Sequence, residues 1–267
     1  MCEANVYLNK SGQEELFMEK VDRIIPGEDQ TLFMESIFGE RRRVKARITE
    51  MELVHHRIII EEIREDIAEP TLEIWLEPET DHGHFHEGEV VELKLLRGYN
   101  MKPALEGEWN SPQVWVINHD GTRQQSELHF HDLIGYIHLG NEADGLLQVY
   151  ASEADEKHLY AKLLIEVGHH HHHSLEPIGL PLEIVPCDNS HARMGESFQI
   201  QVLKEGKPVA GKEIQATFAS TNNRNYPHVM TTDDEGKAKL FLTARGNYLF
   251  TVRDDNITST FTLIKSF

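Results

Sequence analysis

With 267 residues, the chain is too long for one small domain and fits two or three. Its hydrophobic fraction of 39% is typical of a folded protein rather than a disordered one. The formal net charge of −19 disfavours nucleic acids and anionic membranes as main partners and favours metal cations.

The N-terminus, MCEANVYLNK, has neither a basic start nor an apolar core, so we expect no secretory signal. No stretch approaches the roughly 18 consecutive apolar residues of a membrane span. The two cysteines, Cys2 and Cys187, lie far apart in sequence and imply no disulfide framework. We therefore predict a cytoplasmic protein with no membrane partner.

Residues 1 to 66 are predicted to form a small β-rich domain. Short runs of apolar and β-branched residues, such as NVYLN, TLFMESIF and HHRIIIEEI, are separated by turn residues. About six strands in this length favour a small barrel or rolled sheet. Because so small a core is marginal alone, we expect two copies to pair as a homodimer.

One basic run, RRRVKAR at residues 41 to 47, stands out in this first domain. Residues 1 to 66 nevertheless hold 10 Lys and Arg against 15 Asp and Glu, so the domain stays acidic. We interpret the run as the exposed face of a strand, with an RNA-binding patch as the alternative.

The rest of the chain contains an internal repeat. LEIWLEPETDHGHFHEGEVVELKLLRG begins at Leu72, and LEIVPCDNSHARMGESFQIQVLKEG begins at Leu182. Each segment continues through a His-containing loop and Gly-Glu into an alternating strand, which indicates two domains of similar build. Short strands without helical periodicity favour tandem Ig-like β-sandwiches at residues 67–174 and 175–267. The predicted fold class is all-β.

Cys2 is the first candidate metal ligand. Removal of the initiator Met would leave a thiolate and an α-amino group on one residue, and the next backbone amide can be deprotonated. Planar sulfur and nitrogen donors suit Ni(II) or Cu(II) and fit Mg or Ca poorly. The alternative is a small apolar residue at the start of a strand.

Histidine is the most unusual feature of the composition, with 17 residues. In DHGHFHE the histidines alternate, so they point to one side of an extended segment, and HFHD repeats the pattern in the same predicted domain. A five-histidine run lies between the predicted sandwiches and suits loose metal gathering. Solvated loop histidines, and a purification tag for the run, are the alternatives. The candidate ligands are His82, His84, His86, His129, His131, His169, His170, His171, His172 and His173.

The start Met1-Cys2, the run NVYLN and the segment RRVKARITEMELVHHRIIIE resemble the CooT family of small nickel-binding accessory proteins. The resemblance covers residues 1 to 64. It implies a β-rich homodimer, a link to nickel-dependent carbon monoxide dehydrogenase, and nickel ligation by Cys2. Some members carry an RNA-binding label, which the acidic charge does not favour.

Residues 70 to 267 are similar, more loosely, to the NikM-like Ig-fold family linked with nickel and cobalt uptake. LEIWLEPETDHGHFHEGEVVELKLLRGYN and GESFQIQVLKEGKPVAGKEI carry this likeness. The family implies no catalytic residues, and many members are exported, whereas this chain shows no signal.

No nucleophile elbow, Cys-x-x-Cys motif or Gly-rich dinucleotide loop is present in the sequence, and we expect no enzyme activity. The sequence favours a cytoplasmic protein of nickel storage, delivery or homeostasis, with a nickel enzyme or transporter as client. Cobalt, copper or zinc are the alternative metals. The alternative functions are an RNA-binding or regulatory module and a structural adaptor whose Ig-like domains recruit a protein partner.

Overall fold

The computed structural model describes residues 3–10, 13–27, 31–52, 54–62, 71–79, 84–154, 157–168, 175–187, 195–219, 226–242, 244 and 246–264. Strands are the regular elements throughout this described part, which confirms the predicted all-β class. No helix in it is long and apolar enough to span a membrane. The chain forms two compact units, one ending at Glu69 and one beginning at Pro70.

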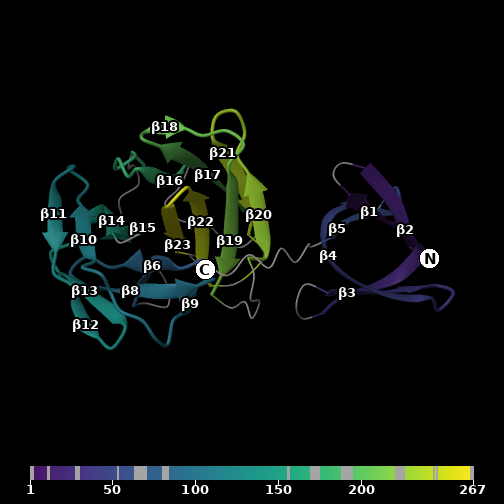
Figure 1. The fold of residues 1–267 in the computed structure, drawn as a ribbon, viewed down its shortest axis with the longest axis horizontal. Helices are drawn as coiled ribbons and strands as arrows, with labels where there is room; N and C mark the ends of the chain where they lie inside the picture. Colours follow the sequence, from purple (N-terminus) through teal and green to yellow (C-terminus); the bar gives the residue numbers. More distant parts are fainter. Residues whose placement is uncertain are drawn as a thin grey trace. The chain divides into compact units, whose positions relative to one another are not determined.

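The first unit is a small closed barrel (Figure 1). Its strands are β1 (Ala4–Lys10), β2 (Gln13–Pro26), β3 (Thr31–Ser36), β4 (Arg41–Glu52) and β5 (Arg57–Glu62). Neighbours pair antiparallel, and β1 closes the barrel by pairing parallel with β5. This closure brings the start of the chain beside the β4–β5 turn, because Asn5 pairs with Arg57.

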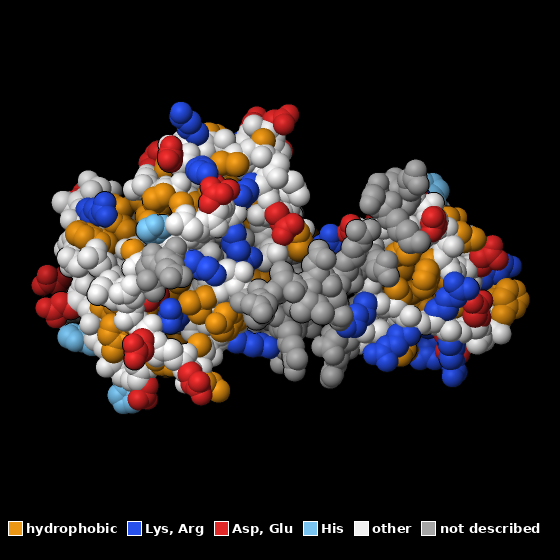
Figure 2. Space-filling view, viewed as in Figure 1, with side chains coloured by type: hydrophobic (Ala, Val, Ile, Leu, Met, Phe, Trp, Pro, Cys, Tyr) orange, Lys and Arg blue, Asp and Glu red, His pale blue; other side chains and the backbone are white. Residues whose placement is uncertain are grey.

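Alternation along each strand separates the inside of the barrel from the outside. On β3, Leu32 and Met34 are buried in the core, whereas Phe33 points outward and is 42% exposed. Figure 2 shows Lys and Arg side chains gathered on the side of the barrel where Figure 1 draws β3. The predicted basic run lies on β4, where Arg41, Arg42 and Arg43 are exposed as expected for the outer face of a strand.

The second unit contains the two segments predicted as sandwiches. Strands of the first repeat are β6 (Glu73–Pro78), β7 (His84–Phe85), β8 (Val91–Tyr99), β9 (Lys102–Pro103), β10 (Gln113–Ile117), β11 (Arg123–Ser126), β12 (His129–His131), β13 (Ile134–Gly140), β14 (Gly145–Ala154) and β15 (His158–Val167). Strands of the second repeat are β16 (Leu182–Pro186), β17 (Ser197–Lys204), β18 (Lys207–Pro208), β19 (Glu213–Phe218), β20 (His228–Thr231), β21 (Lys237–Phe241), β22 (Tyr248–Asp254) and β23 (Ile257–Leu263).

Strand pairing reproduces the repeat that the sequence predicts. In the first copy β8 pairs with β6, β9 and β13, and in the second copy β17 pairs with β16, β18 and β21. Each copy also has its own apolar core, one around Leu93 and one around Val202. The repeated sequence therefore encodes a repeated strand topology.

A single nine-stranded sheet runs through both copies in the order β11-β10-β14-β15-β23-β22-β19-β20, with β7 also on β15 (Figure 1). The two copies join where β15 pairs parallel with β23, from His158 opposite Ile257 to Leu163 opposite Thr262. β15 and β23 are the last strands of the two copies, and their pairing starts at the first residue of each strand. The two copies thus share backbone hydrogen bonds within one compact unit, which we call the sandwich unit.

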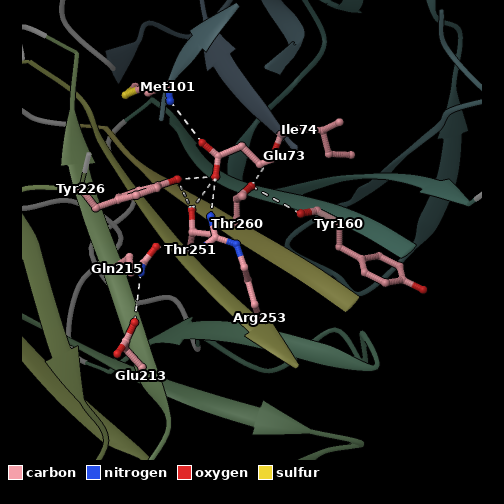
Figure 3. A network of polar contacts seen from close by, with 10 residues as sticks. All are labelled: Glu73, Ile74, Met101, Tyr160, Glu213, Gln215, Tyr226, Thr251, Arg253 and Thr260. Carbon is pink, nitrogen blue, oxygen red and sulfur yellow. Dashed lines mark hydrogen bonds and ion pairs between the residues drawn. The ribbon is translucent and has the colours of Figure 1, made fainter. Parts of the chain in front are cut away.

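A buried carboxylate, Glu73 on β6, crosses the junction between the two copies (Figure 3). Its side chain accepts hydrogen bonds from the Tyr226 and Thr251 hydroxyls of the second copy, the latter at 3.1 Å. It also accepts one from the backbone N–H of Met101 at 3.2 Å and lies 3.6 Å from Arg253. Burial raises the pKa of Glu73, and burial raises the pKa of Tyr226 well above its usual value.

A second buried carboxylate, Glu183 on β16, belongs to the second copy and binds a side chain of the first copy. Lys162 of β15 donates to it at 2.6 Å, and both side chains are 1% exposed. Backbone N–H groups of Ile178, Gly179 and Leu180 also donate to this carboxylate. Burial lowers the pKa of Lys162, although the neighbouring carboxylate acts against this. Glu183 follows Leu182 as Glu73 follows Leu72, so the two glutamates are equivalent in the repeat.

Candidate functional site

The described chain begins at Glu3, directly after the predicted ligand Cys2, which lies outside the described residues. The backbone carbonyl of Glu3 accepts a hydrogen bond from Nδ1 of His56 at 2.9 Å. Because a carbonyl can only accept, Nδ1 carries the proton, and Nε2 of the neutral ring keeps its lone pair. The Asn5 backbone N–H donates to the His56 carbonyl at 2.7 Å, which fixes the same two segments together.

The turn between β4 and β5 positions this histidine. His56 has a left-handed backbone (φ 53°), and its neighbour His55 lies 3.8 Å from Glu52. Parallel closure of β1 onto β5 places this turn beside the N-terminus. The sequence does not indicate His55 or His56 as candidate ligands, because only barrel closure connects them with the first residues of β1.

One oxygen of the Glu3 side chain, Oε2, is buried and has no hydrogen-bond partner among the residues that the structure describes. A buried carboxylate oxygen without a donor is unfavourable, since it has lost water without a replacement. A cation would satisfy it. This oxygen belongs to the residue whose backbone carbonyl the His56 ring contacts. Imidazole and carboxylate groups are both ligands that fit a borderline transition metal.

The other candidate ligands divide by their place in the structure. His82, the side chain of His84 and the run His169–His173 lie outside the described residues. His86 is exposed, and its backbone N–H donates to Glu89 at 2.8 Å. Their metal binding stays a prediction.

His129 and His131 lie on the short strand β12, and both are exposed. His131 is 3.3 Å from Asp132, and His129 is 3.5 Å from Glu127. The histidine ring nearest to His129 in the described contacts is that of His138 on β13, at 6.4 Å between centroids. No group of three or more His, Cys, Asp and Glu side chains is arranged to hold one metal among the residues that the structure describes.

The basic run on β4 is largely neutralised by carboxylates of the barrel itself. Arg41 lies 3.0 Å from Glu35, and Arg42 lies 2.8 Å from Glu40. Arg43 packs over the Phe33 ring at 4.9 Å. A groove of about 520 Å³ runs between these side chains. Its arginines are partly paired, so the surface offers less charge to a nucleic acid than the sequence suggests.

The described chain is thus an all-β protein that joins a small closed barrel to a sandwich unit with one shared sheet. Residues 1–61 match the family described as CO dehydrogenase accessory protein CooT. A solved structure titled putative CooT from Carboxydothermus hydrogenoformans is 46% identical, and it covers 24% of this chain and 100% of its own length, with a TM-score of 0.23. The chain therefore belongs, through its N-terminal barrel, to the CooT family. This supports a nickel-related accessory role.

Residues 153–255 match a domain of unknown function, DUF4198. This match runs from the end of β14 through β22, so it includes β15 and ends just before β23, the strand that pairs with β15 at the junction. The more specific resemblance to a NikM-like family stays a prediction. No curated protein matches the chain.

Two further solved structures are similar to larger parts of the chain at low identity. The D0-D1 domain of Intimin is 16% identical, covering 73% of this chain and 98% of its own, with a TM-score of 0.24. Salmonella alpha-2-macroglobulin reacted with methylamine is 11% identical, covering 89% of this chain and 17% of its own, with a TM-score of 0.28. Neither of these two likenesses bears on function.

Proposed function

We propose that the chain is a non-enzymatic, cytoplasmic nickel-binding accessory protein that stores nickel or delivers it to a nickel enzyme such as carbon monoxide dehydrogenase. Membership of residues 1–61 in a CO dehydrogenase accessory family carries the proposal. Nickel is the cargo, and Cys2 supplies the defining ligand through its thiolate.

The contacts at Glu3 support a metal site at this end of the barrel. The unpartnered Oε2 of Glu3 offers a carboxylate donor, and the His56 ring is held against the residue that follows Cys2. Hydrogen bonding through Nδ1 leaves Nε2 as the ring nitrogen for metal binding, as in many metal-binding histidines. These two groups support the proposal as further donors for a cation bound by Cys2.

Nickel titration of the full-length chain tests this proposal. The starting variant replaces His169–His173 with serines, so that the five-histidine run does not obscure the signal. Ni²⁺ is expected to bind with a thiolate-to-metal charge-transfer absorption band, which disappears in Cys2→Ser. Cys187→Ser, the matched control at the other cysteine, should keep the band. An unchanged band and stoichiometry in Cys2→Ser would overturn the assignment.

The supporting donors are tested by two more variants. Glu3→Gln and His56→Gln should each weaken Ni²⁺ affinity by about 10–100-fold, the usual effect of losing a residue that holds or orients a metal ligand. His55→Gln, in the neighbouring turn position, is the control and should leave the affinity unchanged. If all three variants bind as the parent does, Cys2 acts without help from the barrel.

We further propose that the barrel pairs as a homodimer through its outer apolar side chains. Phe33 is 42% exposed and Phe38 is 77% exposed, which is unusual for phenylalanine on a monomer. Light scattering of the full-length protein should give the mass of a dimer. Phe33→Glu combined with Phe38→Glu should give a monomer, and a mass unaffected by both changes would exclude this interface.

The candidate histidines are proposed to collect nickel for the Cys2 site. Replacing His169–His173 should remove weak metal binding without changing the Cys2 band. The RNA-binding alternative is disfavoured because Arg41 and Arg42 already pair with glutamates of the barrel. The adaptor alternative would gain support if metal content in cells did not respond to changes at any of these ligands.

A further inference from the structure

An imidazole pair that the sequence does not group together lies on the outer face of the five-stranded sheet. His129 on β12 pairs with Tyr136 of β13, and His138 is two residues beyond Tyr136. Side chains two apart on a strand share a face, as do residues directly opposite each other. His129 and His138 are therefore diagonal neighbours on one face, with ring centroids 6.4 Å apart.

A carboxylate on the next strand orients one of these rings. Glu92 of β8 pairs with His138 in register, and its Oε1 lies 2.9 Å from Nδ1 of His138. A carboxylate that accepts from Nδ1 fixes the ring tautomer and leaves Nε2 as the electron donor, which is the usual support of a metal-binding histidine. Glu92 thus prepares His138 to bind a metal through Nε2.

The second ring also lies beside a carboxylate. Glu127 approaches Nε2 of His129 at 3.5 Å, so both imidazoles lie in a locally negative field that favours a bound cation. The side chains of His129 and His138 are 65% and 52% exposed, so a metal ion in solution can reach both rings. Metal–nitrogen bonds are about 2.1 Å long, so one ion bonded to a nitrogen of each ring spans a centroid separation of this size.

We propose that His129 and His138 form a two-histidine transition-metal site on this face, with water completing the coordination. Imidazole ligands suit nickel, zinc and copper and not magnesium or calcium. Figure 2 shows exposed histidine and acidic side chains together on the part of the sandwich unit where Figure 1 places β12 and β13. The site uses no residue of the first unit, so it would remain if the N-terminal assignment failed.

The site also has a mechanical consequence. β12 is the three-residue edge strand of its sheet, and it is held only by β13 in the described pairing. A metal shared by His129 and His138 would clamp this edge strand to its neighbour. Since a ligand that binds only the folded state stabilises it, metal should raise the unfolding temperature of the sandwich unit.

Calorimetric titration with Ni²⁺ and Zn²⁺ tests the site in the full-length chain carrying Cys2→Ser and serines at 169–173. His129→Asn and His138→Asn should each weaken one binding event by about tenfold or more. Because both rings hold one ion, the double variant should lose the same single binding event as either single variant and no further one. Glu92→Gln should weaken binding through His138 without removing a ligand.

His119→Asn is the control, since His119 is exposed in the same unit, is not a candidate ligand, and has no ring contact with His138 among the described residues. It should leave the affinity within about twofold, well below the loss expected for a ligand. The proposal is overturned if His129→Asn and His138→Asn leave the affinity unchanged, or if their effects add as those of independent sites. Loss of the metal-induced rise in unfolding temperature in His138→Asn gives a second, independent readout.

Discussion

Two glutamates occupy equivalent positions in the repeat, yet their carboxylates are satisfied in different ways. Glu183 forms a fully buried ion pair with Lys162 and accepts three backbone N–H groups. Glu73 depends instead on hydroxyl groups and lies farther from its cation, Arg253, which is 28% exposed. The difference shows that the two copies share a buried carboxylate but not its partners.

The two contacts also run in opposite directions across the junction. Glu73 of the first copy binds the second, and Glu183 of the second copy binds the first. Each copy therefore needs the other to satisfy a buried charge, in addition to the shared β15–β23 pairing. We expect the sandwich unit to unfold as one cooperative block. Trp75, Trp109 and Trp115 all belong to it, so tryptophan fluorescence follows this unit without the barrel.

The largest effect is expected for Glu183→Ala. This change leaves the Lys162 ammonium buried without a partner, and removing one partner of a buried pair typically costs about 3–5 kcal/mol. Urea unfolding followed by tryptophan fluorescence should show this loss. Glu142→Ala, at an exposed position of the same unit, should have no measurable effect. A loss for Glu183→Ala no larger than for the control would contradict the role of the pair.

Glu73→Ala should destabilise the same unit by a smaller amount. Tyr226 and Thr251 already contact each other at 2.8 Å, and Arg253 has a second partner in Gln215, so fewer groups lose their hydrogen bonds. We expect about 1–3 kcal/mol, the cost of leaving a buried polar group unpaired. A loss equal to or greater than that of Glu183→Ala would show that the two glutamates are equivalent in energy as well as in sequence.

The pH dependence of stability should distinguish Glu73 from its amide variant. Because burial raises the pKa of Glu73, its contribution to stability is fully present below the ordinary value of 4.5 and is lost as the pH rises through the folded-state pKa. The free energy of unfolding of wild type, relative to Glu73→Gln, should therefore fall as the pH rises above the ordinary value of 4.5. A difference that stays constant or rises with pH would refute this.

Tyr226→Phe should have the smallest effect of the series. It removes one hydroxyl from Glu73, which keeps Thr251 and the Met101 N–H as donors. We expect about 0.5–1.5 kcal/mol, the net value of a typical hydrogen bond. Tyr150→Phe is a matched control, because the Tyr150 hydroxyl is buried without a hydrogen-bond partner in the described part of the chain and its removal should cost nothing. Equal losses in the two variants would mean that the Tyr226 hydroxyl contributes no specific contact.

Much of the local structure was predictable from the sequence. Alternating residues and glycine turns predicted strands throughout, and the confirmed all-β class follows from them. Leu72-Glu73-Ile74 and Leu182-Glu183-Ile184 predicted a repeat, which the matching pairings of β8 and β17 reproduce. The position of His138 is also predictable from the sequence. If a two-residue turn joins His131 to Ile134, then His129 lies opposite Tyr136, and His138, two residues beyond Tyr136, lies on the same face as His129.

Other features depend on pairing between distant segments, which local pattern does not encode. The approach of His56 to Glu3 results from parallel closure of β1 on β5. Nothing near His55 or His56 in the sequence indicates it. Likewise, the sequence predicts the two sandwiches as separate domains. The β15–β23 pairing that joins their sheets cannot be predicted from the residue pattern of either segment alone.

The sequence by itself determined the strand pattern, the repeat, the cysteine at position 2 and the likeness of residues 1–64 to a nickel-related family, because these depend on residue type and spacing. Only the tertiary structure decided which side chains meet: His56 with Glu3, His129 with His138, and each buried glutamate with the opposite copy. The physical reason is that metal donors and buried charges act over a few ångströms. Such distances between remote residues are set by sheet closure and register.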